Sequence, residues 1–102
     1  PMNSSVKRKQ IKIQLVDPHE ITRLGVTHLL ASNREIEICG TSSNGADALK
    51  LAAKYNPDLI IIEPDLHEES GIELISALLK TCKARSLYIP VSKILKFMTK
   101  RL

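Results

Sequence analysis

The stretch Leu59-Ile60-Ile61-Ile62, followed at once by Glu63, decides the fold. Four apolar residues without alternation are typical of a parallel strand that is buried on both faces. A strand of this kind lies in the interior of a sheet, and helices cover both of its sides. We therefore expect it to be the central strand of a parallel sheet with helices on both faces.

Strand and helix patterns alternate along the chain around this run. Residues 11–16, 36–41 and 86–89 have the short β-branched or alternating patterns of three more strands. Three segments between the strands place apolar or small residues at helical spacing. Their expected inner faces are Ile21, Leu24, Gly25, His28 and Leu29 in the first helix, Gly45, Ala48, Leu49, Ala52 and Ala53 in the second, and Gly71, Leu74, Ile75, Leu78, Leu79 and Cys82 in the third. The order β-α-β-α-β-α-β predicts an α/β fold with right-handed crossovers.

Local signals mark where these elements begin and end. Ser43 or Asn44 is expected to cap the second helix, and Asn56-Pro57 to end it. The alternation in residues 36–41 leaves one side of that strand more polar, which places it at an edge of the sheet. Residues 63–70 are expected to form a polar loop.

Length and charge bound the possible functions. The 102 residues suffice for one domain with a single core. The net charge of +4 belongs to the two ends of the chain, because residues 12–90 hold 8 basic and 11 acidic residues, a net of −3. Phe97, Tyr55 and Tyr88 are the only aromatic residues, too few for the stacking platforms that bind single-stranded nucleic acid. Sequence-specific reading of RNA is therefore not expected.

Cysteine spacing and hydropathy exclude further classes of protein. Cys39 and Cys82 lack the spacing of a zinc site or a disulfide framework, which favours packing roles and a reducing, cytoplasmic setting. No apolar stretch approaches the ~18 residues that a membrane span requires. We expect a disordered basic lead-in at residues 1–10, an α/β domain at residues 11–90 and a separate C-terminal segment at residues 91–102.

The C-terminal segment has the pattern of a basic amphipathic helix. Its apolar residues recur at i, i+3, i+4, i+7 and i+11, and basic residues occupy other positions. Such a helix would be either the fourth helix of the domain, docked on the sheet, or a helix that docks on a partner or a membrane surface. The residues expected to bind a partner are Ile94, Leu95, Met98, Lys93 and Lys96.

Acidic residues follow two of the predicted strands. Asp17 and Glu20 come after the first strand, and Glu63 and Asp65 come after the third. Because functional sites of open α/β sheets lie at the carboxyl ends of the strands, these carboxylates are expected to converge on one rim. Hard oxygen ligands of this kind suit Mg²⁺ and phosphoryl chemistry.

Four stretches in order now carry a specific resemblance. They are Ile-Gln-Leu-Val-Asp17-Pro18-His19-Glu20, Thr-Ser-Ser-Asn44-Gly45-Ala-Asp-Ala-Leu, Asn-Pro57-Asp58-Leu-Ile-Ile-Ile-Glu63 and Ser-Gly71-Ile-Glu-Leu. Together they resemble the receiver domain of NarL-type response regulators over roughly residues 11–89. The resemblance implies a CheY-like, flavodoxin-like fold with strand order 2-1-3-4-5, here stopping before the fifth strand and helix.

The resemblance also implies functional positions, and this chain departs from most of them. Receivers pair two acidic residues after the first strand, and Asp17 matches the first of these while Pro18 stands at the second. Glu63 occupies the phosphoacceptor position, where the family has Asp. The position of the Ser or Thr that senses the phosphoryl group falls on Pro90, and no later segment resembles the strand that delivers a Lys.

Each departure leaves alternatives. Glu63 either imitates a phosphorylated Asp, because its permanent carboxylate reaches about 1.5 Å further from the backbone, or has drifted to a solvated carboxylate, or still accepts phosphate. Asp17 serves either sheet-end hydrogen bonds or a degenerate metal site with Glu63 and Asp65. Asp65 is a weaker candidate acceptor.

The histidines suggest little chemistry. His19 and His67 flank the same rim and would, with Asp17 and Glu63, offer ligands to a softer metal such as zinc, although loop histidines are usually solvated. His28 lies on the expected inner stripe of its helix, so we expect a core or boundary residue and not a phosphorelay histidine.

The sequence predicts a non-enzymatic pseudo-receiver of a transcriptional regulator that acts in signalling without phosphorylation. No cofactor is expected, with weak Mg²⁺ binding the exception. Its partner would be another protein or a second copy of the chain. In the homodimer, the two copies would exchange their C-terminal helices, since the fourth strand has an unpaired edge. DNA would be bound only through an effector domain absent from this chain. The alternatives are a working phosphoacceptor of a phosphorelay and a metal or small-molecule sensor at the rim.

Overall fold

The computed structural model describes residues 9–63, 65–66, 69–82, 85–87 and 96. Along the chain these form β1 (Ile11–Val16), α1 (Glu20–Ala31), β2 (Ile36–Ser42), α2 (Gly45–Tyr55), β3 (Leu59–Ile62), β4 (Asp65–Leu66), β5 (Glu69–Ser70), α3 (Gly71–Thr81) and β6 (Arg85–Leu87). The main sheet has the order β2-β1-β3-β6 with parallel pairing throughout. This confirms the α/β fold class, the interior position of β3 and the edge position of β2.

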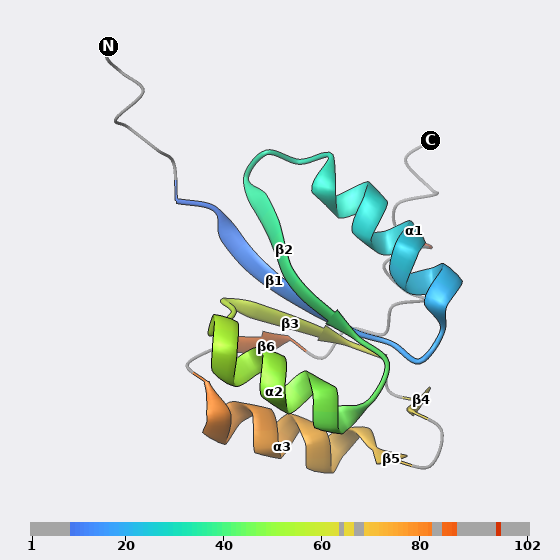
Figure 1. Ribbon diagram of the computed structural model, residues 1–102, viewed down its shortest axis with the longest axis vertical. Helices are drawn as coiled ribbons and strands as arrows, with labels where there is room; N and C mark the ends of the chain where they lie inside the picture. The colour runs from blue at the N-terminus through green and yellow to red at the C-terminus, as the bar shows by residue number, and fades with distance from the viewer. Residues whose placement is uncertain (1–8, 64, 67–68, 83–84, 88–95, 97–102) are drawn as a thin grey trace.

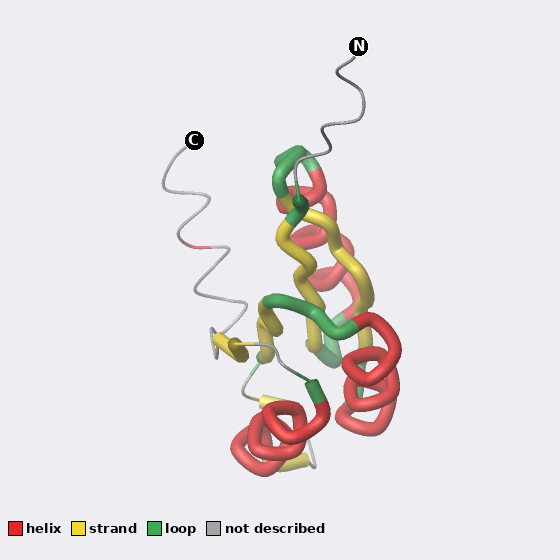
Figure 2. Tube along the Cα trace, turned by 90° about the vertical axis from the view of Figure 1, so that its left-hand side faces the viewer, coloured by secondary structure: helices red, strands yellow, loops and turns green. Residues whose placement is uncertain are grey.

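The two helical layers are unequal. α2 and α3 lie side by side on one face of the sheet, and α1 lies apart from them on the other (Figure 1, Figure 2). One core cluster joins Val16 and Ile60 to the helical residues Ala52 and Leu78. A second cluster joins strand residues such as Leu15 to α1. The alternation of adjacent β1 residues between the clusters shows that this strand is buried on both faces.

One polar side chain lies inside this core. Gln14 in β1 is fully buried, and its Nε2 donates to the backbone oxygen of Ala48 in α2 at 2.8 Å. The bond connects the interior strand β1 to α2, the helix that covers it. It also satisfies the Nε2 donor, which would be costly to bury without a partner.

The helix ends follow the predicted signals. Asn44 caps α2, because its Oδ1 accepts from the backbone N–H of Asp47 at 2.9 Å. Asn56 ends α2 in the left-handed conformation with φ 46°. The segment predicted as a polar loop instead contains the short antiparallel pair β4–β5, which leads into α3. Such two-residue strands carry too little pattern to be found from sequence.

The orientation of α1 overturns a prediction. The stripe expected to face the core is exposed, with Ile21 at 85% and Leu24 at 63%, and His28 is exposed as well, neither core nor boundary. Val26 is the buried residue of this helix. This orientation follows from a hydrogen bond at the start of the helix, in which Arg23 Nη1 donates to the backbone oxygen of Asp17. The bond turns inward the face of the helix that Arg23 shares with Val26. Two other expected inner residues, Ala53 and Leu79, are also exposed.

Several predicted segments lie outside the described residues. These are most of the basic lead-in, the end of the fourth strand beyond Leu87, and the C-terminal segment apart from Lys96. Within the part of the chain that the structure describes, no helix is long and apolar enough to cross a membrane.

The orientation of α1 can be tested by truncating one residue on each of its faces. Val26→Ala removes fully buried methyl groups and should lower the free energy of unfolding by about 2 kcal/mol. Ile21→Ala, on the exposed face, should change it by less than about 0.5 kcal/mol. Urea unfolding in dilute solution measures both. The opposite ranking would show that the stripe predicted from sequence faces the core.

Candidate functional site

The candidate site lies where β1 and β3 end side by side. Val16 and Ile62 are partners in the parallel register, so the residues that follow them, Asp17 and Glu63, leave the sheet at neighbouring positions. The backbone N–H of Glu63 donates to Val16 O at 2.9 Å, which extends the pairing to the last residue of β1. This is the rim at which the sequence placed the site.

Asp17 is the structural centre of the rim. Its side chain is fully buried, and its backbone N–H donates to Ser42 O in β2 at 3.0 Å. Its Oδ1 accepts from the backbone N–H of His19 at 2.8 Å, a turn that leads the chain into α1. Arg23 Nη1 donates to its backbone oxygen at 2.6 Å. These are the sheet-end hydrogen bonds that one interpretation of Asp17 predicts.

The carboxyl of Asp17 is only half engaged. His19 Nδ1 lies 2.9 Å from the same Oδ1 and donates to it in the tautomer or charge state that carries the Nδ1 proton. The His19 side chain is 56% exposed, so the pair spans the boundary between core and solvent. The second oxygen, Oδ2, is buried and finds no hydrogen-bond partner among the described residues.

These residues do not fit a Mg²⁺ ion. Magnesium requires near-octahedral oxygen coordination, usually with more than one ligand from the protein. Here Oδ2 of Asp17 is a single buried acceptor, and half-buried Pro18 stands at the next position. In the described parts of the chain, no three His, Cys, Asp or Glu side chains come together as a metal site. Among the described residues, Asp17, Glu63 and Asp65 therefore form no cluster of metal ligands, and the weak metal site expected from sequence stays a prediction.

The other predicted carboxylates have separate environments. Glu63 is half-buried, and its Oε1 accepts from the backbone N–H of Asp65 at 3.4 Å. Asp65 belongs to β4, where it pairs with Ser70, and it is exposed. Glu20 is exposed in the first turn of α1, where an acidic residue favours the helix dipole.

Most of the remaining predicted site residues lie outside the part of the chain that the structure describes. Pro90, His67 and the expected partner-binding residues Ile94, Leu95, Met98 and Lys93 lie outside the described residues. Lys96 is described and exposed. The zinc alternative, which needs His67, and the switch position at Pro90 thus stay predictions.

The structure adds residues that the sequence did not single out. Arg23 holds the end of β1, and Ser42 is a buried polar residue at the end of β2 whose Oγ has no partner among the described residues. The signal for Arg23 was a long basic side chain one turn into a helix that follows a strand-end acid. Ser42 offered a weaker signal, a small polar residue closing an apolar strand.

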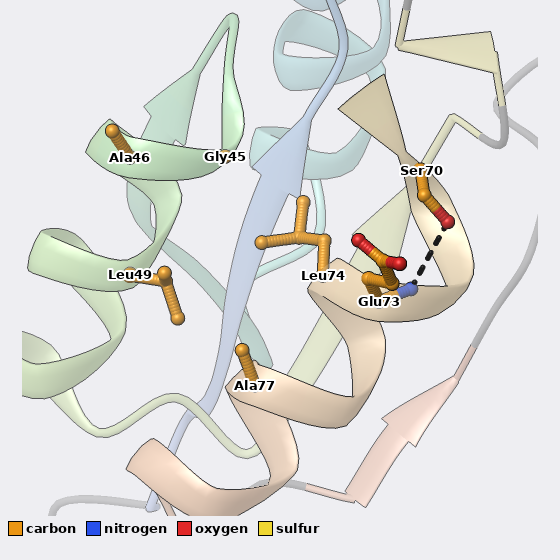
Figure 3. A pocket seen from close by; sticks show the side chains of 7 residues that line it. All are labelled: Gly45, Ala46, Leu49, Ser70, Glu73, Leu74 and Ala77. Carbon is orange, nitrogen blue, oxygen red and sulfur yellow. Dashed lines mark hydrogen bonds between the residues drawn. The ribbon is translucent and has the colours of Figure 1, made fainter.

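A pocket of about 460 Å³ lies between the N-terminal halves of α2 and α3 (Figure 3). Leu49, Leu74 and Ala77 give it an apolar wall, and Glu73 supplies its carboxylate. The backbone N–H of Glu73 is already taken, because it donates to Ser70 Oγ at 3.3 Å. None of the unpartnered buried polar atoms found in the described chain lines this pocket. Its polar lining therefore consists of Glu73 and Ser70, at the start of α3.

Cys39 has the packing role expected from sequence. Its Sγ donates to Ile13 O across the β1–β2 pair at 3.6 Å. Burial raises the pKa of the Cys39 thiol above its usual value, so the thiol stays protonated and unreactive near neutral pH.

The comparisons with known proteins agree with this geometry. Residues 13–93 match the response regulator receiver domain family. The chain belongs to that family. The transcriptional regulatory protein DegU of Brevibacillus brevis is 35% identical to this receiver over 72 residues, which make up 71% of this chain and 30% of that protein. The receiver chain thus spans about a third of the curated relatives it matches.

Solved receiver structures share its fold. The signal receiver domain of the response regulator NarL from Mycobacterium tuberculosis has a TM-score of 0.73 and 23% identity, over 81% of this chain and 68% of that chain. CheY6 of R. sphaeroides, solved in complex with the P1 domain of CheA3, has a TM-score of 0.67 and 19% identity, over 78% and 62% of the two chains. At such identities the likeness shows the fold alone, and it confirms the CheY-like arrangement.

The structural role of Asp17 in this receiver can be separated from metal binding. Asp17→Asn keeps an oxygen that accepts from His19 and should leave the free energy of unfolding within about 1 kcal/mol of wild type. Asp17→Ala removes the acceptor and leaves a buried gap, which should cost about 1–3 kcal/mol. Urea unfolding with and without Mg²⁺ measures both effects, and Mg²⁺ should change neither. A rise in wild-type stability with Mg²⁺ that Asp17→Asn abolishes would show that Asp17 is a metal ligand.

Proposed function

We propose that this receiver acts in two-component signalling as a protein-interaction module that works without phosphorylation. One observation carries the proposal: the single buried carboxyl of the rim, Asp17, is engaged in hydrogen bonds that build the fold, and the described residues assemble no metal site around it. Phosphoryl transfer requires charge stabilisation by a metal or by cationic side chains, and the cation described at the rim, Arg23, is engaged with the backbone oxygen of Asp17.

The residue at the acceptor position supports the same conclusion. Glu63 holds its carboxylate about one carbon–carbon bond, roughly 1.5 Å, further from the backbone than an Asp would. It is half-buried beside β1, and its side chain accepts a hydrogen bond from the backbone N–H of Asp65. The negative charge at the rim therefore belongs to the side chain and needs no phosphorylation. A permanent charge at this point would keep the surrounding loop in one state, where an ordinary receiver switches between two.

The wider role follows from the relatives. DegU is a transcriptional regulator, which supports a place for this receiver in a transcriptional regulator whose DNA binding resides in an effector domain absent from this chain. CheY6 in its complex with the P1 domain of CheA3 supports a protein as the class of partner. We assign the module no enzymatic activity and no cofactor, and we place it in the cytoplasm.

One observation favours a second function, that of a working phosphoacceptor. Oδ2 of Asp17 is buried and finds no partner among the described residues, and a cation would satisfy it. A single monodentate oxygen holds Mg²⁺ weakly, however, and Pro18 adds no ligand. This function therefore requires ligands that the described rim does not supply.

The intact mass of the protein after incubation with a small phosphodonor and Mg²⁺ tests the proposal. The wild type should gain no phosphoryl group. The double variant Glu63→Asp, Pro18→Asp serves as a control, because it restores both acidic positions that receivers use. A phosphoryl adduct on the wild type would contradict the proposal and favour the phosphoacceptor function.

A further inference from the structure

The pocket between α2 and α3 is part of a longer groove that both helices form, called here the α2–α3 groove (Figure 3). The two helices lie side by side and run in the same direction, because each lies in a crossover between parallel strands. Leu49, Leu74 and Ala77 form the apolar wall between them. A groove of this kind is a surface on which a further helix can lie.

The two helices that form the groove have the same charge order. Asp47 in α2 and Glu73 in α3 lie in the first turns, whereas Lys54 and Lys80 lie in the last turns, and all four residues are exposed. The Glu73 carboxylate lines the pocket and makes no hydrogen bond or ion pair with the described residues. The groove is therefore negative at the rim and positive about 10 Å away, the rise along α3 from Glu73 to Lys80.

We propose that the α2–α3 groove binds a helix of another protein that packs antiparallel to α2 and α3. The partner helix has acidic residues in its first turn and basic residues in its last turn, which is the order that the helix dipole favours. Antiparallel packing sets this order opposite the charges of the groove. It also opposes the dipole of the partner to the two parallel dipoles of α2 and α3. An apolar side chain of the partner is seated on the wall formed by Leu49, Leu74 and Ala77.

The positions of the charges favour a helix over a small ligand. The polar lining of the pocket, Glu73 and Ser70, lies at one end of it, at the start of α3. Small-ligand sites usually fix a ligand by several polar groups that converge on it. Lys80 lies about two helical turns beyond Glu73, where only an elongated partner reaches both charges.

The charge order also distinguishes this partner from the C-terminal segment of the chain itself. Residues 91–102 contain the basic residues Lys93, Lys96, Lys100 and Arg101 and no acidic residue. Such a segment would match the negative end of the groove but would bring positive charge to its positive end as well. A helix with one acidic and one basic end matches both ends.

This interface rests on the proposed function and deepens it, because it names the surface and the class of partner. Its test uses neither phosphodonor nor Mg²⁺. Absence of helix binding would leave the result of the intact-mass experiment unchanged. A phosphoryl adduct on the wild type would, in turn, leave helix binding in the groove unchanged. The two failures are therefore distinguishable.

Two peptides of about 20 residues, long enough to be helical in isolation, serve as probes for the full chain. They share one stripe of leucines, and a side-chain staple holds both of them helical. The first has glutamates in its first turn and arginines in its last, whereas the control peptide has arginines at both ends. The first peptide should bind about fivefold more tightly, since one end of the control meets like charge. Fluorescence anisotropy measures both affinities.

A spin label on the C-terminal end of the first peptide tests the antiparallel orientation. The label should broaden the amide signal of Glu73 more strongly than that of Lys80 in the ¹H–¹⁵N correlation spectrum. Stronger broadening at Lys80 would show parallel packing and would overturn the proposal.

Substitutions at the two ends of the groove separate the contributions of charge. Glu73→Gln should weaken binding of both peptides, whereas Lys80→Gln should weaken the first and strengthen the control. Ala77→Gln should weaken both, because its longer side chain lies across the apolar wall. Ile72→Gln is the matched control, since Ile72 is 77% exposed on α3 and does not line the pocket, and it should change neither affinity. Circular dichroism should show all four variants folded.

Three results would overturn the proposal. The first is that neither peptide binds the wild type. The second is binding that Ala77→Gln leaves unchanged, which would place the peptides outside the groove. The third is tighter binding of the control peptide, or of a peptide with the sequence of residues 91–102, which would assign the groove to a uniformly basic segment.

Discussion

The hydrogen bonds around Asp17, at the carboxyl end of the interior strand β1, are the constraint on which the rest of the structure depends. Through its backbone and side chain this residue joins β1 to β2 by Ser42 O, to the first turn of α1 by His19 and to the body of α1 by Arg23. These bonds set the rotation of α1 about its own axis. They lie at the rim, beside Glu63. Because the carboxyl is buried, losing its partners would leave polar groups unsatisfied inside the fold.

Under the proposed function, the same arrangement explains how a receiver fold persists without phosphoryl transfer. A carboxyl that only held a metal would have little reason to remain once the second acid became Pro18. Asp17 also builds the fold, so stability alone preserves it. Glu63 differs from Asp17, since it is half-buried and its side chain accepts a long hydrogen bond from the backbone N–H of Asp65, at 3.4 Å. Charge at the rim is therefore retained while transfer chemistry is not supported.

The sequence was a sufficient guide wherever one pattern had a single physical solution. A four-residue apolar run rich in Ile and preceded by a turn signal indicates a buried parallel strand, and Asn44 and Asn56 have the side chains that start and end a helix. The apolar periodicity identified α1 but not its rotation. An apolar stripe either packs in the core or forms a binding surface, and the spacing does not distinguish the two. The true inner face, marked by Val26, is shared by Arg23, whose bond to the backbone oxygen of Asp17 is not visible in the apolar periodicity of the helix. The hydrogen bonds of Asp17 were likewise one of two open alternatives until its surroundings were known.

Under the proposed function, the rim is a set of structural hydrogen bonds in one fixed state. The most direct measurement is the ¹H–¹⁵N correlation spectrum of the protein, recorded while Mg²⁺ and then a small phosphodonor are added. The amide signals of His19, Glu63 and Asp65 should keep their positions throughout. Saturable shifts of these signals would contradict the proposed function, because they would show that the rim binds the ion and responds to phosphorylation.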